Sequence, residues 1–190
     1  MANGLYQTEG IILDSREVGE ADKILTVFTK EFGRLKLFAR GTRRISSKLN
    51  RFLNLFSYAR FDFVSGKESW HLIDAEELRN LDSILKERER VKILGKVSNF
   101  LERFHRGEGR DLVMFQLISN SLDFLGSCPP EFLRDFELIF YAKALVILGY
   151  LNEASFPDEL TNLVEDTGFR PEFLPLWSRR RKELYEAVRR

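Results

Sequence analysis

Apolar and polar residues alternate in short runs over the first 80 residues, and glycines separate the runs. The alternation is clearest at residues 58–63, where successive side chains would face opposite sides of a sheet around Phe61. A period of two with turn residues between the runs is typical of half-buried antiparallel strands. The pattern predicts one strand over residues 4–16, a hairpin over 22–40 turning near Gly33, and a hairpin over 53–78 turning near Gly66.

After about residue 79 the apolar residues recur every three to four positions, which indicates amphipathic helices. We expect helices over residues 81–104, 111–127, 129–151, 157–166 and 171–190. The third is apolar on most faces, as is typical of the central helix of a bundle. The change of period predicts two domains, 1–79 and 80–190, without a linker between them.

Five strands of uneven length, with a basic insertion between the third and the fourth, suggest a small closed barrel of the OB type. An SH3-like barrel would give a similar pattern. The predicted fold class is therefore α+β, with an N-terminal five-stranded OB barrel followed by an all-α helical domain. Barrels of this type bind ligands on their outer face and connecting loops.

Composition supports a folded core and excludes several classes of site. The chain has 190 residues, of which 44% are apolar and 17 are Phe, and its formal net charge is +1. Its single cysteine, Cys128, excludes a disulfide framework and a cysteine-based zinc site within one chain. The first ten residues lack the basic and apolar regions of a signal peptide, so we expect a cytoplasmic protein.

The positive charge is unevenly distributed, because the segment from Phe32 to Phe61 holds eight Lys and Arg and no Asp or Glu. A solvated face would normally mix both signs, whereas a track of cations can neutralise several phosphates. Nucleic-acid binding, a solvated basic face and an acidic protein partner all remain open from composition alone. Phe32, Phe38 and Phe52 lie among these charges, as stacking faces for bases or as core residues.

Other polar groups favour structural roles over catalysis. Glu20 and Asp22 lie two residues apart in a predicted turn, where they are typical of turn and capping groups. His71 and His105 belong to no motif, and no phosphate-binding loop or nucleophile motif is present, so we expect no enzyme. The basic C-terminal segment 179–190 fits a solvated helix face, an extension of a DNA track or a site for an acidic peptide.

The segment "TEGIILDSREVGEADKILTVFTKEFGRLKLFARGTRR", followed by "SSKL", resembles the RecO family of bacterial recombination mediators. The resemblance continues more loosely through "AEEL", "FQLISNSLDFL" and "FELIFYAKALVILGY". It implies a non-catalytic protein that binds single- and double-stranded DNA, anneals complementary strands and assists RecA loading in recombinational repair. The implied partners are RecR and, in many members, single-strand-binding protein, in the bacterial cytoplasm at the nucleoid.

The family contacts DNA through basic positions on the OB fold. The matching candidates here are Lys23, Arg34, Lys36, Arg40, Arg43, Arg44 and Lys48, and charge alone adds Arg51 and Arg60. Many members carry a cysteine-based zinc module after the central helix, but residues 148–169 of this chain contain no cysteine. We therefore expect no metal and no cofactor. The chain is also short at its C-terminal end, and a partner contact that depends on this module, including contact with RecR, would be missing with it.

Two other functions fit the same sequence. One is an interaction adaptor whose barrel and helices dock protein partners, and the other is a general OB protein that binds single-stranded DNA or RNA. Charge reversal in the basic segment separates the adaptor from the mediator, and competition between RNA and DNA separates the third class.

Overall fold

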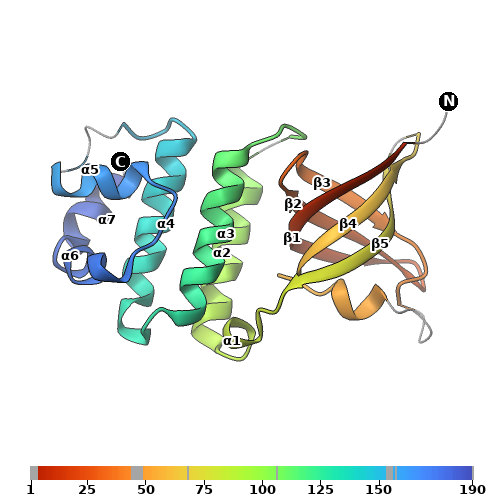
Figure 1. The fold of residues 1–190 in the computed structure, drawn as a ribbon, viewed down its shortest axis with the longest axis horizontal. Helices are drawn as coiled ribbons and strands as arrows, with labels where there is room; N and C mark the ends of the chain where they lie inside the picture. Colours follow the sequence, from red (N-terminus) through yellow and green to blue (C-terminus); the bar gives the residue numbers. More distant parts are fainter. Residues whose placement is uncertain are drawn as a thin grey trace. The chain divides into compact units, whose positions relative to one another are not determined.

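The structure is a computed structural model that describes residues 4–43, 49–67, 69–105, 107–152, 156 and 158–189. Five strands form a closed barrel with the order β1-β2-β3-β5-β4 (Figure 1). Helices follow the barrel in the chain, so the predicted fold class, an OB barrel and then a helical domain, is confirmed. The strands are β1 (Leu5–Val18), β2 (Asp22–Thr29), β3 (Gly33–Ala39), β4 (Tyr58–Ser65) and β5 (Trp70–Arg79).

Both predicted hairpins are present, and a short parallel contact between β3 and β5 closes the barrel. That contact pairs Leu37 with Trp70 and Phe38 with His71. Gly33 begins β3 with a φ of 65°. A Cβ atom at Gly33 would lie 2.1 Å from the carbonyl oxygen of Gly109, so both backbone conformation and close packing require glycine there.

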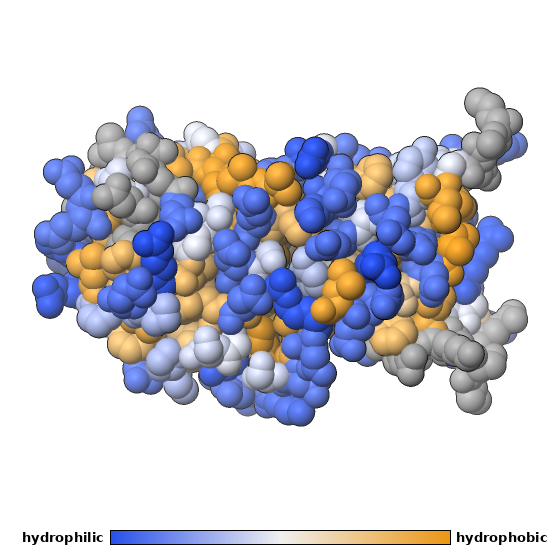
Figure 2. All heavy atoms as spheres, viewed as in Figure 1, coloured by the Kyte–Doolittle hydropathy of each residue, from blue (hydrophilic) through white to orange (hydrophobic). Residues whose placement is uncertain are grey.

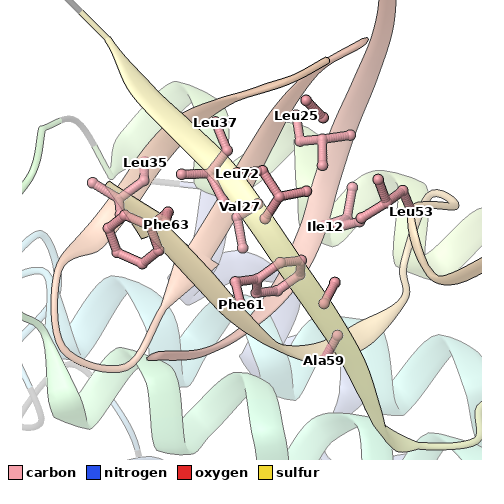
Figure 3. Packing of buried hydrophobic residues seen from close by; sticks show 12 residues of the cluster. Ile12, Leu25, Val27, Leu35, Leu37, Leu53, Ala59, Phe61, Phe63 and Leu72 are labelled. Carbon is pink, nitrogen blue, oxygen red and sulfur yellow. The ribbon is translucent and has the colours of Figure 1, made fainter. Parts of the chain in front are cut away.

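The barrel interior is filled by alternate residues of the strands (Figure 3). Leu53, which follows a 3-10 helix at Leu49–Phe52, adds a side chain to this core. Phe61 and Phe63 are fully buried within it. Burial of the inward set leaves the alternate residues of each strand on the outer face, which is where a barrel of this kind can bind a ligand.

The helices are α1 (Asp82–Leu85), α2 (Arg88–Phe104), α3 (Leu112–Ser127), α4 (Leu133–Ile147), α5 (Asp158–Glu165), α6 (Leu174–Arg179) and α7 (Arg181–Arg189). The first and last predicted helices are each divided, the first around Lys86 and Glu87 and the last at Arg180. Helix α4 ends where Gly149 adopts a φ of 73° and its backbone N–H donates to the carbonyl of Val146, as in a glycine C-cap.

The chain divides into two compact units. The first comprises Met1–Asp82 and Leu94–Leu112, and the second comprises Ser83–Ile93 and Val113–Arg190. The domain boundary after residue 79 stays a prediction. In the face shown in Figure 2, blue hydrophilic residues alternate with smaller orange groups of apolar residues.

Within the second unit, the buried carboxylate of Asp135 on α4 accepts two hydrogen bonds from Arg181 on α7, at 2.5 and 2.7 Å. The hydrogen bonds to Asp135 raise the pKa of Arg181 above its ordinary value. Arg180 forms ion pairs with Glu159 at 2.9 Å and Glu183 at 3.1 Å. Two of the six cations of the basic C-terminal segment are thus bound by acids of their own unit.

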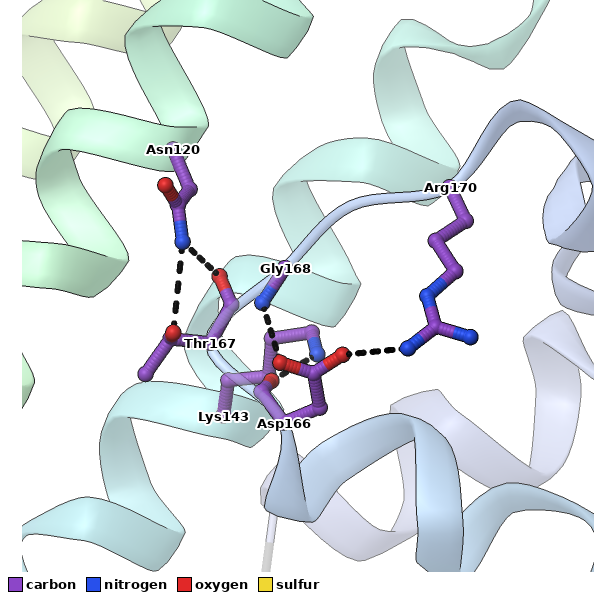
Figure 4. A network of polar contacts seen from close by, with 6 residues as sticks. All are labelled: Asn120, Lys143, Asp166, Thr167, Gly168 and Arg170. Carbon is purple, nitrogen blue, oxygen red and sulfur yellow. Dashed lines mark hydrogen bonds and ion pairs between the residues drawn. The ribbon is translucent and has the colours of Figure 1, made fainter.

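A second polar network joins α4 to the chain after α5 (Figure 4). Lys143 is 1% exposed, and its ammonium donates to the backbone carbonyl of Asp166. Asn120 of α3 donates to the carbonyl of Thr167 at 3.1 Å, and Arg170 pairs with the Asp166 carboxylate at 3.1 Å. Burial lowers the pKa of Lys143 to about 8.

Candidate nucleic-acid interface

Strand β3 places its cations on the outer face of the barrel, because Leu35, Leu37 and Ala39 alternate with them and are buried. Arg34 is partly exposed and Lys36 is exposed. Phe38 follows on the same face, two residues along the strand. The outer face of β3 therefore offers two cations and an aromatic ring in a row.

The connection between β4 and β5 borders this row. The parallel contact between β3 and β5 brings Trp70 and His71 beside Leu37 and Phe38, and the ring centroids of Phe38 and His71 lie 5.8 Å apart, edge to face. Together the strands and loops enclose a groove of about 600 Å³. Its lining residues are Ile24, Arg34, Lys36, Phe38, Ser65, Gly66, Lys67, Ser69, Trp70, Gly107 and Glu108.

Three cations in or beside the groove have no carboxylate within ion-pair distance in the described part of the chain. They are Lys36, Lys67 and Arg40, which follows β3 directly; both lysines and Arg40 are exposed. The guanidinium of Arg40 lies 5.7 Å from the centroid of the Phe38 ring. A surface with cations that no acid neutralises is the electrostatic feature that phosphate binding requires.

Arg34 also lines the groove, but part of its guanidinium has a structural role. Its Nη1 donates to the backbone carbonyl of Glu102 at 2.9 Å, in the last turn of α2. This carbonyl is one of the groups that a helix C-terminus leaves without an internal partner, and a cation there is favourable. Arg34 therefore joins the end of α2 to the barrel and presents its remaining donors to the groove.

The other predicted cations are distributed differently. Arg43 pairs with Glu17 at 2.9 Å and donates to the carbonyl of Gly19 at 3.1 Å, beside the turn between β1 and β2. Arg60 lies on β4, outside the groove, and its guanidinium forms an ion pair with Glu76 of β5. Lys23 is half-buried at the start of β2, opposite Glu17 of β1. Arg44, Lys48 and the side chain of Arg51 lie outside the described residues.

The outer face of β1, β4 and β5 has the opposite character. Cross-strand pairing aligns Glu9 with Arg60 and Glu76 in one row and Gln7 with Asp62 and Asp74 in the next. These two rows contain four carboxylates, Glu9, Glu76, Asp62 and Asp74, and one cation, Arg60. Lys30, from outside the rows, pairs with Glu9 at 3.6 Å. The barrel therefore presents a cationic groove on β2, β3 and the β4–β5 loop, and an acidic face on the other three strands.

Of the three aromatic residues considered as stacking faces, only Phe38 lines the groove. Phe52 packs against the barrel core, and Phe32 belongs to a cluster at one end of the barrel with Tyr6, Phe63 and Trp70. Trp70 is the aromatic residue that sequence reasoning missed, together with Lys67. The available signal was topological, since the loop between strands 4 and 5 of an OB fold borders the strand 2–3 face.

The remaining polar candidates have local partners. The Asp22 carboxylate accepts the backbone N–H of Gly41 at 2.7 Å, in agreement with a turn-stabilising role. His105 is buried against the ring of Phe28, and its Nε2 lies 3.1 Å from the Asp111 carboxylate. Among the described residues there is no group of three or more His, Cys, Asp or Glu arranged to hold a metal ion. Nor does any helix of the described ranges combine the length and apolar character needed to cross a membrane.

These features define a class of protein, an OB barrel with a cationic groove on its β2–β3 face that is followed by helices. Residues 1–80 match the family model described as "Recombination protein O N terminal". The match confirms the resemblance to the RecO family, whose N-terminal domain corresponds to the barrel of this chain.

Relatives named DNA repair protein RecO extend the similarity beyond the barrel. The protein from Halalkalibacterium halodurans is 27% identical over 141 residues, which are 73% of this chain and 56% of the relative. The protein from Rubrobacter xylanophilus is 30% identical over 146 residues, 77% of this chain and 58% of the relative. The protein from Desulfitobacterium hafniense is 36% identical over 64 residues, 34% of this chain and 23% of the relative. This chain thus spans less than three fifths of these relatives.

Proposed function

We propose that this protein binds DNA through the cationic groove of its barrel and acts in recombinational DNA repair. The observation that carries the proposal is the grouping of Lys36, Arg40 and Lys67 at the groove, without a carboxylate partner in the described part of the chain. Several cations on one surface can neutralise successive phosphates of a strand and release its bound counterions. The names of the relatives, DNA repair protein RecO, support the same process.

The finer role that we propose is that of a mediator. It binds single- and double-stranded DNA, anneals complementary strands and assists RecA loading, with RecR and single-strand-binding protein as partners in the cytoplasm. Annealing needs no catalytic group, because a cationic surface that holds two strands lowers their mutual repulsion while base pairing decides the product.

A protein-docking role is the second candidate, and the acidic outer face of β1, β4 and β5 favours it. Ile73 is 53% exposed on this side of β5, close to Asp74 in the sequence. Exposed apolar residues rimmed by one sign of charge are typical of surfaces that bind a partner of the opposite sign. Such docking is compatible with DNA binding at the groove.

The test of the proposed function is a triple charge reversal, Lys36→Glu, Arg40→Glu and Lys67→Glu. Fluorescence anisotropy with a labelled single-stranded oligonucleotide over a salt series measures the affinity and its salt slope. At about −0.7 per phosphate contact on a single strand, three contacts contribute about −2 to the slope, or a roughly twentyfold weakening between 50 and 200 mM salt. We expect the triple variant to lose this contribution and to lose strand annealing.

A second triple variant, Arg16→Glu, Lys92→Glu and Lys182→Glu, is the control. It changes the net charge equally at exposed cations that do not line the groove. Equal loss of affinity in both triple variants, or unchanged annealing in the groove variant, would contradict the proposal.

A further inference from the structure

The groove contains an aromatic side chain, Trp70, although the binding of phosphates by cations does not require one. Trp70 begins β5, is partly exposed and lines the groove. Two rings pack against the indole nearly at right angles: Tyr6, at 5.3 Å and 85°, and Phe63, at 5.3 Å and 88°. Since Phe63 is fully buried, the indole is fixed to the barrel core and not to a mobile loop.

The polar edge of the indole also has a defined partner. The Nε1 of Trp70 lies 3.3 Å from a carboxylate oxygen of Glu108, which lines the groove as well. Glu108 is exposed and stands between Gly107 and Gly109, in the segment that follows α2. This segment belongs to the same compact unit as the barrel, and it packs on it closely enough that Gly33 and Gly109 meet. The indole of Trp70 is therefore oriented by the rings of Tyr6 and Phe63 and by the Glu108 carboxylate.

The dimensions and charges of the groove suit one nucleotide unit better than a duplex. A volume of about 600 Å³ lies within the range of small-ligand pockets, about 300–1,000 Å³. Lys36 and Lys67 line the same groove as the indole, so a base and its flanking phosphates find complementary groups there. In a duplex, the bases are stacked and paired inside the helix, and only the phosphates reach a surface of this kind.

We propose that the groove takes an unpaired base of a single DNA strand, which stacks on Trp70 while Lys36 and Lys67 hold the adjacent phosphates. Trp70 is thus the residue that distinguishes single-stranded from duplex DNA, and the duplex is bound by the cations alone. The inference rests on the proposed function, because it assigns the form of DNA that the same groove prefers. A groove that prefers unpaired bases lets a mediator bind single strands before it anneals them.

The test compares Trp70→Leu with the unchanged protein on a single-stranded oligonucleotide and on the duplex of the same sequence. Loss of one stacked base weakens binding about tenfold, so we expect that loss for the single strand and less than a twofold change for the duplex. Trp70→Phe keeps a ring and should retain most of the single-strand preference. Equal losses on both forms of DNA, or no loss on either, would overturn the inference.

A second measurement holds even where Trp70→Leu folds poorly. The chain has two tryptophans, and Trp177 is buried in the other unit, so Trp177→Phe leaves Trp70 as the only indole. Single-stranded DNA should quench its fluorescence in a saturable titration, and duplex DNA should leave it nearly unchanged. Absence of quenching by a bound single strand would refute the stacking. If the groove triple variant still bound DNA normally, the proposed function itself would fail, and the two failures are thus distinguishable.

Discussion

The buried ammonium of Lys143 makes a specific prediction for the dependence of stability on pH. Burial lowers its pKa from 10.5 to about 8, whereas the unfolded chain returns it to its ordinary value. Between these two pH values the unfolded state binds more protons than the folded state, so stability must rise with pH. Below about pH 8 the lysine is charged in both states, and the cost of burying it is constant.

The magnitude follows from the shift. A difference of about 2.5 pH units corresponds to ~3 kcal/mol of destabilisation at neutral pH, of which about 2 kcal/mol is recovered between pH 7.5 and 9.5. Lys143→Met removes the titrating group and fills a similar volume. We expect the free energy of unfolding of the unchanged protein to gain about 2 kcal/mol relative to Lys143→Met over this interval.

Urea unfolding at a series of pH values measures this difference directly. Burial also raises the pKa of the Cys128 thiol to about 11, which lowers stability as the pH rises above about 9, but this effect is common to both proteins and cancels. Lys182→Met removes an exposed lysine of the same unit and serves as the matched control. Parallel pH profiles for Lys143→Met and the unchanged protein would show that burial does not lower the pKa of Lys143.

Three further predictions test other parts of the structure. Glu108→Gln removes a negative charge from the groove. Because a charge pair at 4 Å in water is worth ~1 kcal/mol, single-stranded DNA should bind about fivefold more tightly, as measured by fluorescence anisotropy. Weaker binding would contradict repulsion between Glu108 and the DNA phosphates. Arg181→Met leaves the buried Asp135 carboxylate without its bidentate partner and should lower the free energy of unfolding in urea by about 3 kcal/mol, whereas an unchanged midpoint would show that the pair is not a structural clip. Gly33→Ala should lower the free energy of unfolding by at least ~2 kcal/mol, because it adds a backbone clash to the cost of a positive φ. Gly19→Ala, at a φ of 56° with open space around it, should lower it by only about 1 kcal/mol. Equal decreases in melting temperature for the two variants would argue against the close packing at Gly33.

The barrel was predictable from local signals, because its strands and turns follow rules that act over a few residues. The period of two around Phe61 and the turn glycines Gly33 and Gly66 predicted both hairpins. The division of the first helix after Leu85 was not predicted, since the apolar period continues through it. Local patterns thus set the order of the elements, and tertiary packing sets their limits.

Which residues form the site was harder to predict from the sequence, because the site depends on residues that are far apart in the chain. Arg60 and Glu76 are 16 residues apart and meet only through the register of β4 and β5, so a count of charges within one segment could not show that they pair. In the same way, Trp70 reaches the groove through the β3–β5 contact that closes the barrel. A run of cations in the sequence predicts that a surface is positively charged, and the register of the sheet decides which of these cations lie on that surface.

Photo-crosslinking of a single-stranded oligonucleotide that carries 5-iodouracil, followed by identification of the modified residues by mass spectrometry, locates the bound DNA on the protein. We expect the DNA to lie in the groove formed by β2, β3 and the β4–β5 loop. The predicted result is crosslinks at Trp70 and Phe38 that the groove triple variant abolishes. Crosslinks confined to the outer faces of β1 and β4, or to α7, would contradict it.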